Sequence, residues 1–184
     1  MSIAAGASQS FVIAFTPNAP FVPTTVMLGF DCAGVDAAPT NIGLNTLLLS
    51  ASSTPVPDIV ALAATSQNDG ILHITGTTGS IAFAVATVNV GASAQITATA
   101  NTSAVTLPVT ITLWQTNPTG GQCFSPPASS VTTTISANAT PTFGIFATAS
   151  GSVPFDPANN RIFVQFGDAG GVVRGSTSVA VETQ

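Results

Sequence analysis

Apolar and polar residues alternate along most of the chain with the period of a β-strand. Between Val109 and Trp114, every second residue is aliphatic, so these residues face one side of the strand. The other side carries two threonine hydroxyl groups and the indole of Trp114. Val26, Leu28 and Phe30 form a similar apolar stripe earlier in the chain. No window of about 11 residues has a clean helical period, so the pattern predicts an all-β protein.

Twelve strands are predicted, separated by clusters of Gly, Pro, Asn, Asp and Ser that favour turns. In the first half they are expected at residues 10–16, 23–31, 44–51, 57–65, 70–76 and 81–90. In the second half they are expected at residues 93–100, 107–115, 130–137, 141–149, 161–167 and 172–182. Paired glycines after two of these strands predict that each half ends in a hairpin.

The two halves of the chain have related sequences. Residues 71–90 align without a gap with residues 162–181, a separation of 162 − 71 = 91 residues, and five positions are identical. Cys32 and Cys123 have the same separation. Near the start of each half, a Gly-Ala-Ser sequence recurs with a separation of 91 − 6 = 85 residues. A repeat of this length indicates a repeated folding unit.

The repeat predicts the domain organisation. Six or seven antiparallel strands in each unit of about 90 residues are typical of a two-sheet immunoglobulin-like sandwich. We therefore predict two tandem immunoglobulin-like antiparallel β-sandwich domains related by internal duplication, at residues 1–90 and 91–184. The short connection between them predicts a stiff rod.

Charged residues are rare, which narrows the classes of partner. They make up 5% of the chain, against about 25% in an average soluble domain. There is no lysine, and Arg161 and Arg174 are the only cations, so the formal net charge is −5. This balance argues against binding to nucleic acid or to an anionic membrane surface. No apolar run approaches about 18 residues, so membrane insertion is not predicted.

The single histidine and the two cysteines are the first candidates for chemistry. His73 aligns with Val164, so we expect an ordinary strand residue whose polar tip is exposed or satisfied. One histidine cannot supply a Ser-His-Asp triad in both halves. Cys32 and Cys123 fall in equivalent loops, and free thiols are favoured over an intermolecular or cross-domain disulfide.

The acidic residues are the remaining candidates, and each lies close to turn-forming residues. Their default role is to bond the backbone of their own turn. The best calcium candidate is residues 156–160, with Asp31 or Asp168 as a further ligand. We assign no catalytic, cofactor-binding or metal-binding residue and predict no cofactor. The acids are Asp31, Asp36, Asp58, Asp69, Asp156, Asp168 and Glu182.

Three stretches of the second half resemble a known class of repeat. Residues 130–143, 153–164 and 168–181 are similar to bacterial immunoglobulin-like repeats of large exported proteins, especially those of alphaproteobacteria. The resemblance covers most of both halves and carries no catalytic motif. It implies an exported, modular and non-enzymatic protein. The first residues lack the pattern of a signal peptide, which leaves open a piece of a longer exported protein, another export route, or no export.

The leading hypothesis is a non-catalytic structural or adhesive module of an extracellular or cell-surface protein, acting as a spacer or partner-contact domain. The first alternative is a self-assembling subunit of a fibre or a virion decoration protein, with residues 3–15 as a donated strand. The second is a carbohydrate-binding module. The expected partners are proteins or further copies of the chain, through sheet edges. A glycan lacks support because the candidate aromatics are scattered: Phe21, Phe30, Trp114 and Phe124.

Overall fold

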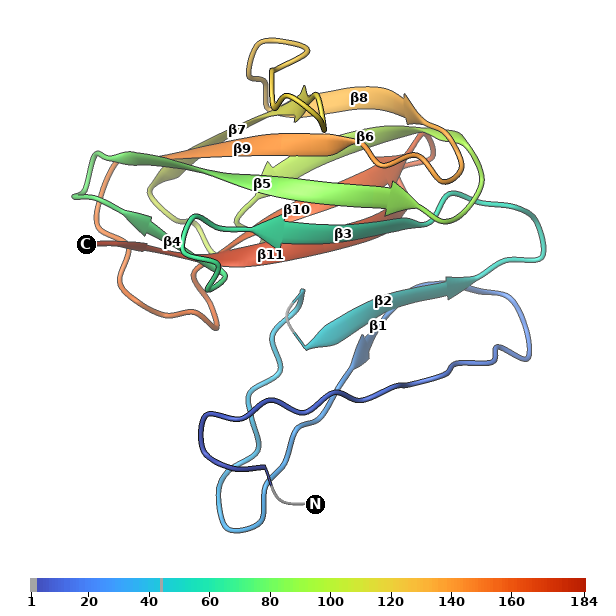
Figure 1. Cartoon of the computed structure of the whole chain (residues 1–184), viewed down its shortest axis with the longest axis horizontal. Helices are drawn as coiled ribbons and strands as arrows, with labels where there is room; N and C mark the ends of the chain where they lie inside the picture. Colours follow the sequence, from blue (N-terminus) through green and yellow to red (C-terminus); the bar gives the residue numbers. More distant parts are fainter. Residues whose placement is uncertain (1–2, 44) are drawn as a thin grey trace.

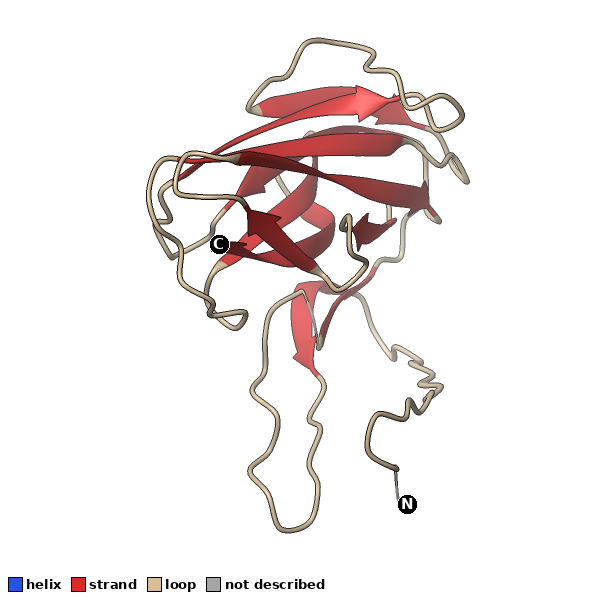
Figure 2. Ribbon diagram, turned by 60° about the vertical axis from the view of Figure 1, so that its left-hand side comes forward, coloured by secondary structure: helices blue, strands red, loops and turns tan. Residues whose placement is uncertain are grey.

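Figure 1 shows a computed structural model of the protein, which describes residues 3–43 and 45–184. Every regular element in this part of the chain is a β-strand (Figure 2). The all-β prediction is therefore confirmed. The strands are β1 (Phe21–Met27), β2 (Thr46–Ala51), β3 (Ile59–Ala64), β4 (Ile71–Ile74), β5 (Ser80–Asn89), β6 (Ala94–Asn101), β7 (Val109–Thr116), β8 (Ser130–Ile135), β9 (Thr142–Ala149), β10 (Arg161–Asp168) and β11 (Val173–Thr183).

Strands β3 to β11 form two sheets that enclose one core, and we call this part the sandwich. The five-stranded sheet has the order β4-β11-β10-β6-β8, and the four-stranded sheet has the order β3-β5-β9-β7. Neighbouring strands are antiparallel, except that β4 runs parallel to β11. Strands β1 and β2 form a separate antiparallel hairpin.

The alternation seen in the sequence positions each strand against the core. In β5, Phe83, Val85 and Thr87 are buried, and the alanines between them are exposed. The facing sheet buries Phe166 of β10, whose ring lies 5.4 Å from that of Phe143 in β9 at an interplanar angle of 57°. A tilted aromatic pair of this kind adds about 1 kcal/mol to the free energy gained by burial.

Eleven of the twelve predicted strands are confirmed, with ends that differ by a few residues. The prediction of a strand at residues 10–16 is wrong for this structure, because that segment is exposed and has no strand assignment. Its sequence has the strand pattern. A strand also needs a neighbour for its backbone N–H and C=O groups, and no described strand pairs with this segment.

One of the two predicted hairpins is present. Strands β10 and β11 pair antiparallel through the turn that follows Asp168. The other hairpin prediction is wrong, because β4 pairs with β11 and β5 pairs with β3 and β9. The chain therefore crosses from one sheet to the other at Gly76, whose φ is 66°. A glycine at positive φ permits a tight turn but does not decide which sheet the next strand joins.

The structure also corrects the predicted domains at residues 1–90 and 91–184. Strand β5 precedes that boundary and pairs with β9, which follows it, and the same holds for β4 and β11. A single hydrophobic cluster runs from Ile59 to Val181. Two units of about 90 residues do not bury separate cores here, because strands from both halves close the same sandwich.

The predicted domain junction lies inside this core. Asn89 is fully buried, and its Oδ1 atom accepts hydrogen bonds from the backbone N–H groups of Asp58 at 3.1 Å and Gly91 at 3.0 Å. Its Nδ2 atom donates to the carbonyl oxygens of Ala92 at 2.8 Å and Ile135 at 3.0 Å. These four bonds join segments from both sides of the predicted boundary, so Asn89 cannot belong to a solvated linker.

The aligned halves also face the core in opposite phase. Ile162 is fully buried, whereas the aligned Ile71 is partly exposed. Leu72 is fully buried, and the aligned Phe163 is partly exposed. A shift of one residue moves every side chain of a strand to the other face. Related sequences therefore form strands with different positions in the sandwich.

The described residues of 3–51 form an N-terminal arm that lies beside the sandwich (Figure 1). None of them is buried, and the arm holds twelve of the nineteen large hydrophobic residues that are exposed in the described structure. It is joined to β11 where Ser178 Oγ donates a hydrogen bond of 3.3 Å to the Ile42 carbonyl. Gly43 permits this approach, because its φ is 79° and a Cβ atom there would lie 2.6 Å from Ser178 Oγ.

Candidate functional site

His73 lies in a polar cluster that we call the histidine clasp: Asp69, His73, Glu182 and Gln184. His73 Nε2 lies 2.9 Å from Asp69 Oδ2, and His73 Nδ1 lies 2.7 Å from Glu182 Oε1. Gln184 Nε2 lies 2.9 Å from His73 Nδ1 and donates to Glu182 Oε1 at 2.6 Å. Thr65 Oγ1 donates to Asp69 Oδ1 at 3.1 Å. The clasp therefore ties the turn after β3 to the parallel strands β4 and β11.

The two carboxylates favour the charged form of the imidazole. The hydrogen bond to Asp69, followed by that to Glu182, raises the pKa of His73 above its usual value of 6.5. In return, His73 and the backbone N–H of Ile71 lower the pKa of Asp69 to about 2. At mildly acidic pH the clasp is therefore an imidazolium between two carboxylates.

The contacts of the clasp favour a structural role over general base catalysis. A histidine that activates a nucleophile must have a ring nitrogen directed at it. Both ring nitrogens of His73 instead contact Asp69, Glu182 and Gln184. The polar tip is thus satisfied, as predicted. The comparison with Val164 carried little information, because Val164 is in the core and His73 is not.

Asp168 stabilises the turn between β10 and β11. Its Oδ1 atom accepts from the backbone N–H groups of Gly170 at 2.9 Å and Val172 at 3.0 Å, and its Oδ2 atom accepts from Arg174 Nε at 2.7 Å. Burial raises the pKa of Asp168, but the bonds from Arg174 and the turn outweigh burial and hold that pKa below 3.8. This is the turn role predicted for the acids.

The calcium candidate at residues 156–160 also stabilises its own turn. The Asp156 carboxylate accepts from the backbone N–H of Asn159 at 3.3 Å and from its Nδ2 at 2.9 Å. Asp31 lies in the arm, and Asp168 caps another turn. Within residues 3–43 and 45–184, no group of three or more His, Cys, Asp or Glu side chains is arranged to hold a metal ion.

The two cysteines are free and exposed. Cys32 lies in the arm between β1 and β2, and Cys123 lies in the loop after β7. The structure thus has the free thiols that the sequence favoured. Arg161, by contrast, is buried, and its guanidinium donates to Ser178 Oγ at 3.1 and 3.0 Å and to the Pro157 carbonyl at 2.7 Å.

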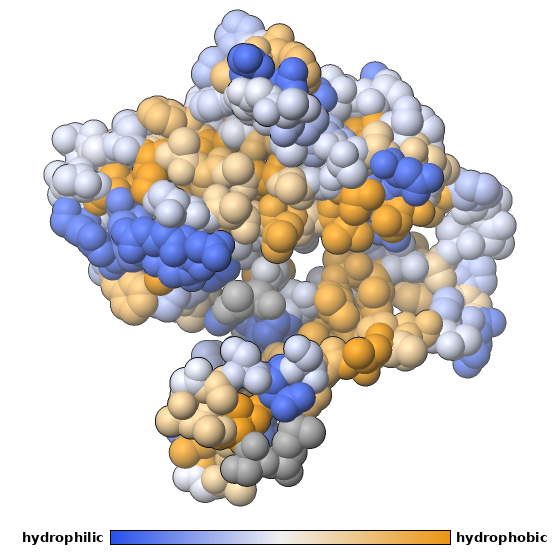
Figure 3. Space-filling model, in the orientation of Figure 1, coloured by the Kyte–Doolittle hydropathy of each residue, from blue (hydrophilic) through white to orange (hydrophobic). Residues whose placement is uncertain are grey.

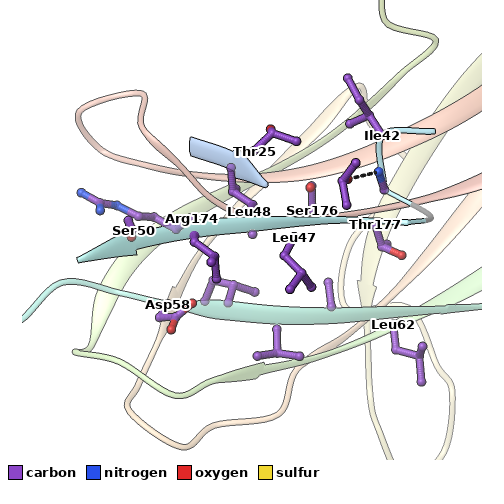
Figure 4. Close-up of a pocket in the computed structure, with 17 residues that line it drawn as sticks. Thr25, Ile42, Leu47, Leu48, Ser50, Asp58, Leu62, Arg174, Ser176 and Thr177 are labelled. Carbon is purple, nitrogen blue, oxygen red and sulfur yellow. Dashed lines mark hydrogen bonds between the residues drawn. The ribbon is translucent and has the colours of Figure 1, made fainter. Parts of the chain in front are cut away.

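A groove of about 470 Å³ separates the arm from the sandwich (Figure 4). We call it the β2–β3 groove, because residues 46–50 of β2 and residues 58–62 from the start of β3 line it. Residues 174–177 of β11 and the arm residues Thr25, Ile42 and Gly43 complete it. In the close-up, Leu47 lies between the two strands. Eight of its seventeen lining residues are aliphatic, five are Ser or Thr, and Asp58 and Arg174 are its charged residues.

The outer face of the four-stranded sheet is a second apolar surface. None of its four strands contains a charged residue, and Val60, Leu62 and Phe146 are 54%, 71% and 38% exposed. Figure 3 shows apolar residues across the middle of this face. Trp114 packs over Gly144, where a Cβ atom would lie 2.9 Å from the indole ring. The face is therefore uncharged, with alanines and larger apolar side chains on β3 and β5, and threonines around Trp114 and Phe146 on β7 and β9.

The candidate aromatics do not form a platform for a sugar. Phe21 and Phe30 lie in the arm, Trp114 lies in β7, and Phe124 lies in the loop after β7. Trp114 shares the outer face with Phe146, because β7 and β9 pair in a register that places Trp114 opposite Gly144. The four aromatic residues are therefore scattered in the structure, as the sequence predicted.

Comparison with known proteins found no relative: no protein-family model matches the chain, and no curated protein matches it. In the described part of the chain, no helix has the length and apolar character needed to cross a membrane.

Sequence reasoning missed the clasp and the groove. His73 and Glu182 are 109 residues apart, and the parallel pairing of β4 with β11 brings them together. Asp69 is four residues before His73, which is the one signal that could have linked them. The groove needs the placement of β2 beside β3, and no local pattern encodes that placement.

Proposed function

We propose that the chain is a non-catalytic structural or adhesive module of an extracellular or cell-surface protein, and that it acts as a spacer or partner-contact domain. The observation that carries this proposal is the path of the chain. It enters β3 at one end of the sandwich and leaves β11 at the other (Figure 1). With this path, residues 59–183 would carry tension along their own strand direction, from the start of β3 to the end of β11.

The strand order supports an immunoglobulin-like assignment within this proposal. Immunoglobulin sheets have the orders A-B-E-D and C-F-G. Strands β3-β5-β9-β7 and β6-β10-β11 follow these two orders when labelled along the chain. The sandwich adds β4 beside the last strand and β8 beside β6. The resemblance to exported bacterial repeats points to the same class and to a location outside the cytoplasm.

The proposal is tested by stretching single molecules of the full chain held at both ends. The sandwich should unfold in one discrete event, because residues 59–183 share one core. Those 125 residues should release roughly 40 nm of chain, at about 3.5 Å per residue. The arm should extend without a force peak. Gradual extension of the whole chain would contradict a load-bearing spacer.

A self-assembling subunit, as in a fibre or a virion, is a second candidate, and the arm favours it. Twelve large apolar residues are exposed there, a number unusual for a surface without a partner. A carbohydrate-binding module has less support, because only Trp114 and Phe146 share a face.

A further inference from the structure

We infer that the β2–β3 groove accepts residues 10–16 of a second copy of this chain as an added β-strand. This inference deepens the partner-contact role proposed above by naming the partner and the strand edge. The stretching experiment does not depend on it, so the two can fail separately.

The groove is bordered by two strand edges that carry no further strand among the described residues. The edge of β3 lies against β11 at Ile59, so the edge of β2 is the one open to a new strand. Strand β3 is the last strand of its sheet and pairs only with β5, and β2 pairs only with β1. Five consecutive residues from each side line the groove. Since side chains alternate between faces, a run of consecutive lining residues indicates that the backbone edge itself borders the space. Free edges of this kind add strands readily.

The donor segment has the composition of a strand but no partner. Phe11, Val12, Ile13 and Phe15 are 58%, 99%, 53% and 49% exposed. At the separation of 85 residues, the segment aligns with residues 95–101 of β6, which pairs with a strand on each side.

This alignment predicts which side chains of the donor strand form its apolar face. Phe11 corresponds to Ile96 and Ile13 to Ala98, and both β6 residues are buried. Val12 corresponds to Thr97, which bonds Thr132 outside the core. The apolar face of the donor is therefore Phe11, Ile13 and Phe15.

The order of the strands predicts the orientation of the added strand. Residues 10–16 and β2 are the first and third strands expected in their half, and β6 and β8 hold the same places in the second half. Strands β6 and β8 pair antiparallel in the sandwich. We therefore expect the donor to run antiparallel to β2, along the edge that lines the groove.

The donor must come from another molecule in this orientation. A segment antiparallel to β2 is parallel to β1, because β1 and β2 are antiparallel. Its last residue would then lie about 22 Å from the start of β1, given six steps of about 3.3 Å along the strand and two spacings of about 4.8 Å across the sheet. The five Cα-to-Cα steps from residue 16 to residue 21 reach about 18 Å. A second copy removes this restriction, and each copy would offer both a donor and an acceptor.

Charge does not oppose this contact. The donor segment has no charged residue, and neither has β2. The groove contributes Asp58 and Arg174, and Arg174 is already paired with Asp168. Because donor and acceptor are different surfaces, the association is head-to-tail and can form open chains.

The test compares two lysine variants of the full chain by sedimentation velocity over a range of concentrations. The wild-type chain should form dimers and longer species that grow with concentration. Ile13→Lys should raise the dissociation constant at least tenfold, because it places a charge on the face that enters the groove. Val12→Lys is the matched control and should change it less than twofold, because that side chain points away.

A mixing experiment identifies the acceptor. In the hairpin, the Asn45 carbonyl oxygen accepts a hydrogen bond from the backbone N–H of Leu28, so the backbone groups of Asn45 face β1. Successive residues of a strand direct their backbone groups to opposite edges, so the N–H of Leu48 lies on the free edge of β2. Leu48→Pro removes that donor and should give a monomer. Mixing Ile13→Lys with Leu48→Pro leaves one intact donor and one intact acceptor, and should give dimers only.

Four results would overturn the inference: a monomeric wild-type chain, equal weakening by the two lysine variants, no dimer in the mixture, or a monomer whose amides at residues 10–16 resist hydrogen exchange. The last result would place the segment in its own groove. If Leu48→Pro does not fold, the lysine pair still decides.

Discussion

At the scale of single residues, Asn89 and His73 show how polar side chains fix the positions of strands. Asn89 bonds four backbone groups in the core, and each would lose its partner if the side chain were truncated. Near the surface, His73 also joins separate segments, through its contacts with the charged carboxylates of Asp69 and Glu182. The two differ in their response to pH, because only the clasp titrates.

We expect replacement of His73 by glutamine to remove a pH-dependent part of the stability. The folded-state pKa of His73 is raised, so its contribution is complete below pH 6.5 and is lost as the pH rises through the raised pKa. The pKa of Asp69 is lowered to about 2, so its contribution is present above pH 3.8 and lost towards pH 2. The clasp should therefore stabilise most between about pH 4 and pH 6.5.

Urea unfolding of the wild-type chain and of His73→Gln at pH 5 and pH 8.5 measures this effect. The difference in free energy of unfolding should be larger at pH 5. Glu182 and Asp69 are the charged groups that contact the imidazole, so Glu182→Gln should reduce the pH dependence in part. An equal difference at both pH values would show that the clasp acts without its charge.

At the scale of elements, the close contact between β3 and β11 controls how the sandwich closes. A Cβ atom on Gly175 would lie 1.9 Å from the Ile59 carbonyl oxygen, which is backbone and cannot move alone. This close approach is the reason that position 175 requires glycine. The backbone conformation is not the reason, because the φ of Gly175 lies outside the left-handed region. The same contact holds β3 beside the groove.

We therefore expect Gly175→Ala to lower the free energy of unfolding by at least about 2 kcal/mol, as overpacking against backbone does. Gly167→Ala in the neighbouring strand β10 is the control, because the nearest atoms to its Cβ would be 4.0 Å away. Thermal or urea unfolding measures both variants. A loss of stability of similar size in both would contradict the proposed contact.

At the scale of the whole molecule, one compact sandwich carries an arm that has no core. All buried residues lie at or after Ile59, so the arm depends on the sandwich, or on a partner, for its order. Regions with few buried contacts open first, which makes proteolysis a direct measure of this difference.

We expect the folded chain to resist trypsin. Its two possible cleavage points are Arg161, which is 4% exposed in β10, and Arg174, which is paired with Asp168 in β11. A protease specific for aromatic residues should instead cut the arm at Phe30, which is exposed in the segment between β1 and β2. Mass spectrometry of timed digests distinguishes these products. Rapid cleavage of native protein at Arg161 would contradict the buried position of β10.

The sequence by itself determined the strands. Alternation at a period of two is local, so eleven of twelve strands could be predicted, as could the turn roles of Asp156 and Asp168. The twelfth, at residues 10–16, has the pattern but no neighbour in the structure, and a strand exists only when its backbone is paired.

Only the tertiary structure decided which strands share a sheet. The repeat indicated two domains, yet β4 and β5 lie in different sheets while the aligned β10 and β11 lie in one. Pairing partners are chosen by long-range burial, which a local period does not encode. For that reason the clasp around His73 and the β2–β3 groove exist only in the folded chain, where residues distant in sequence meet.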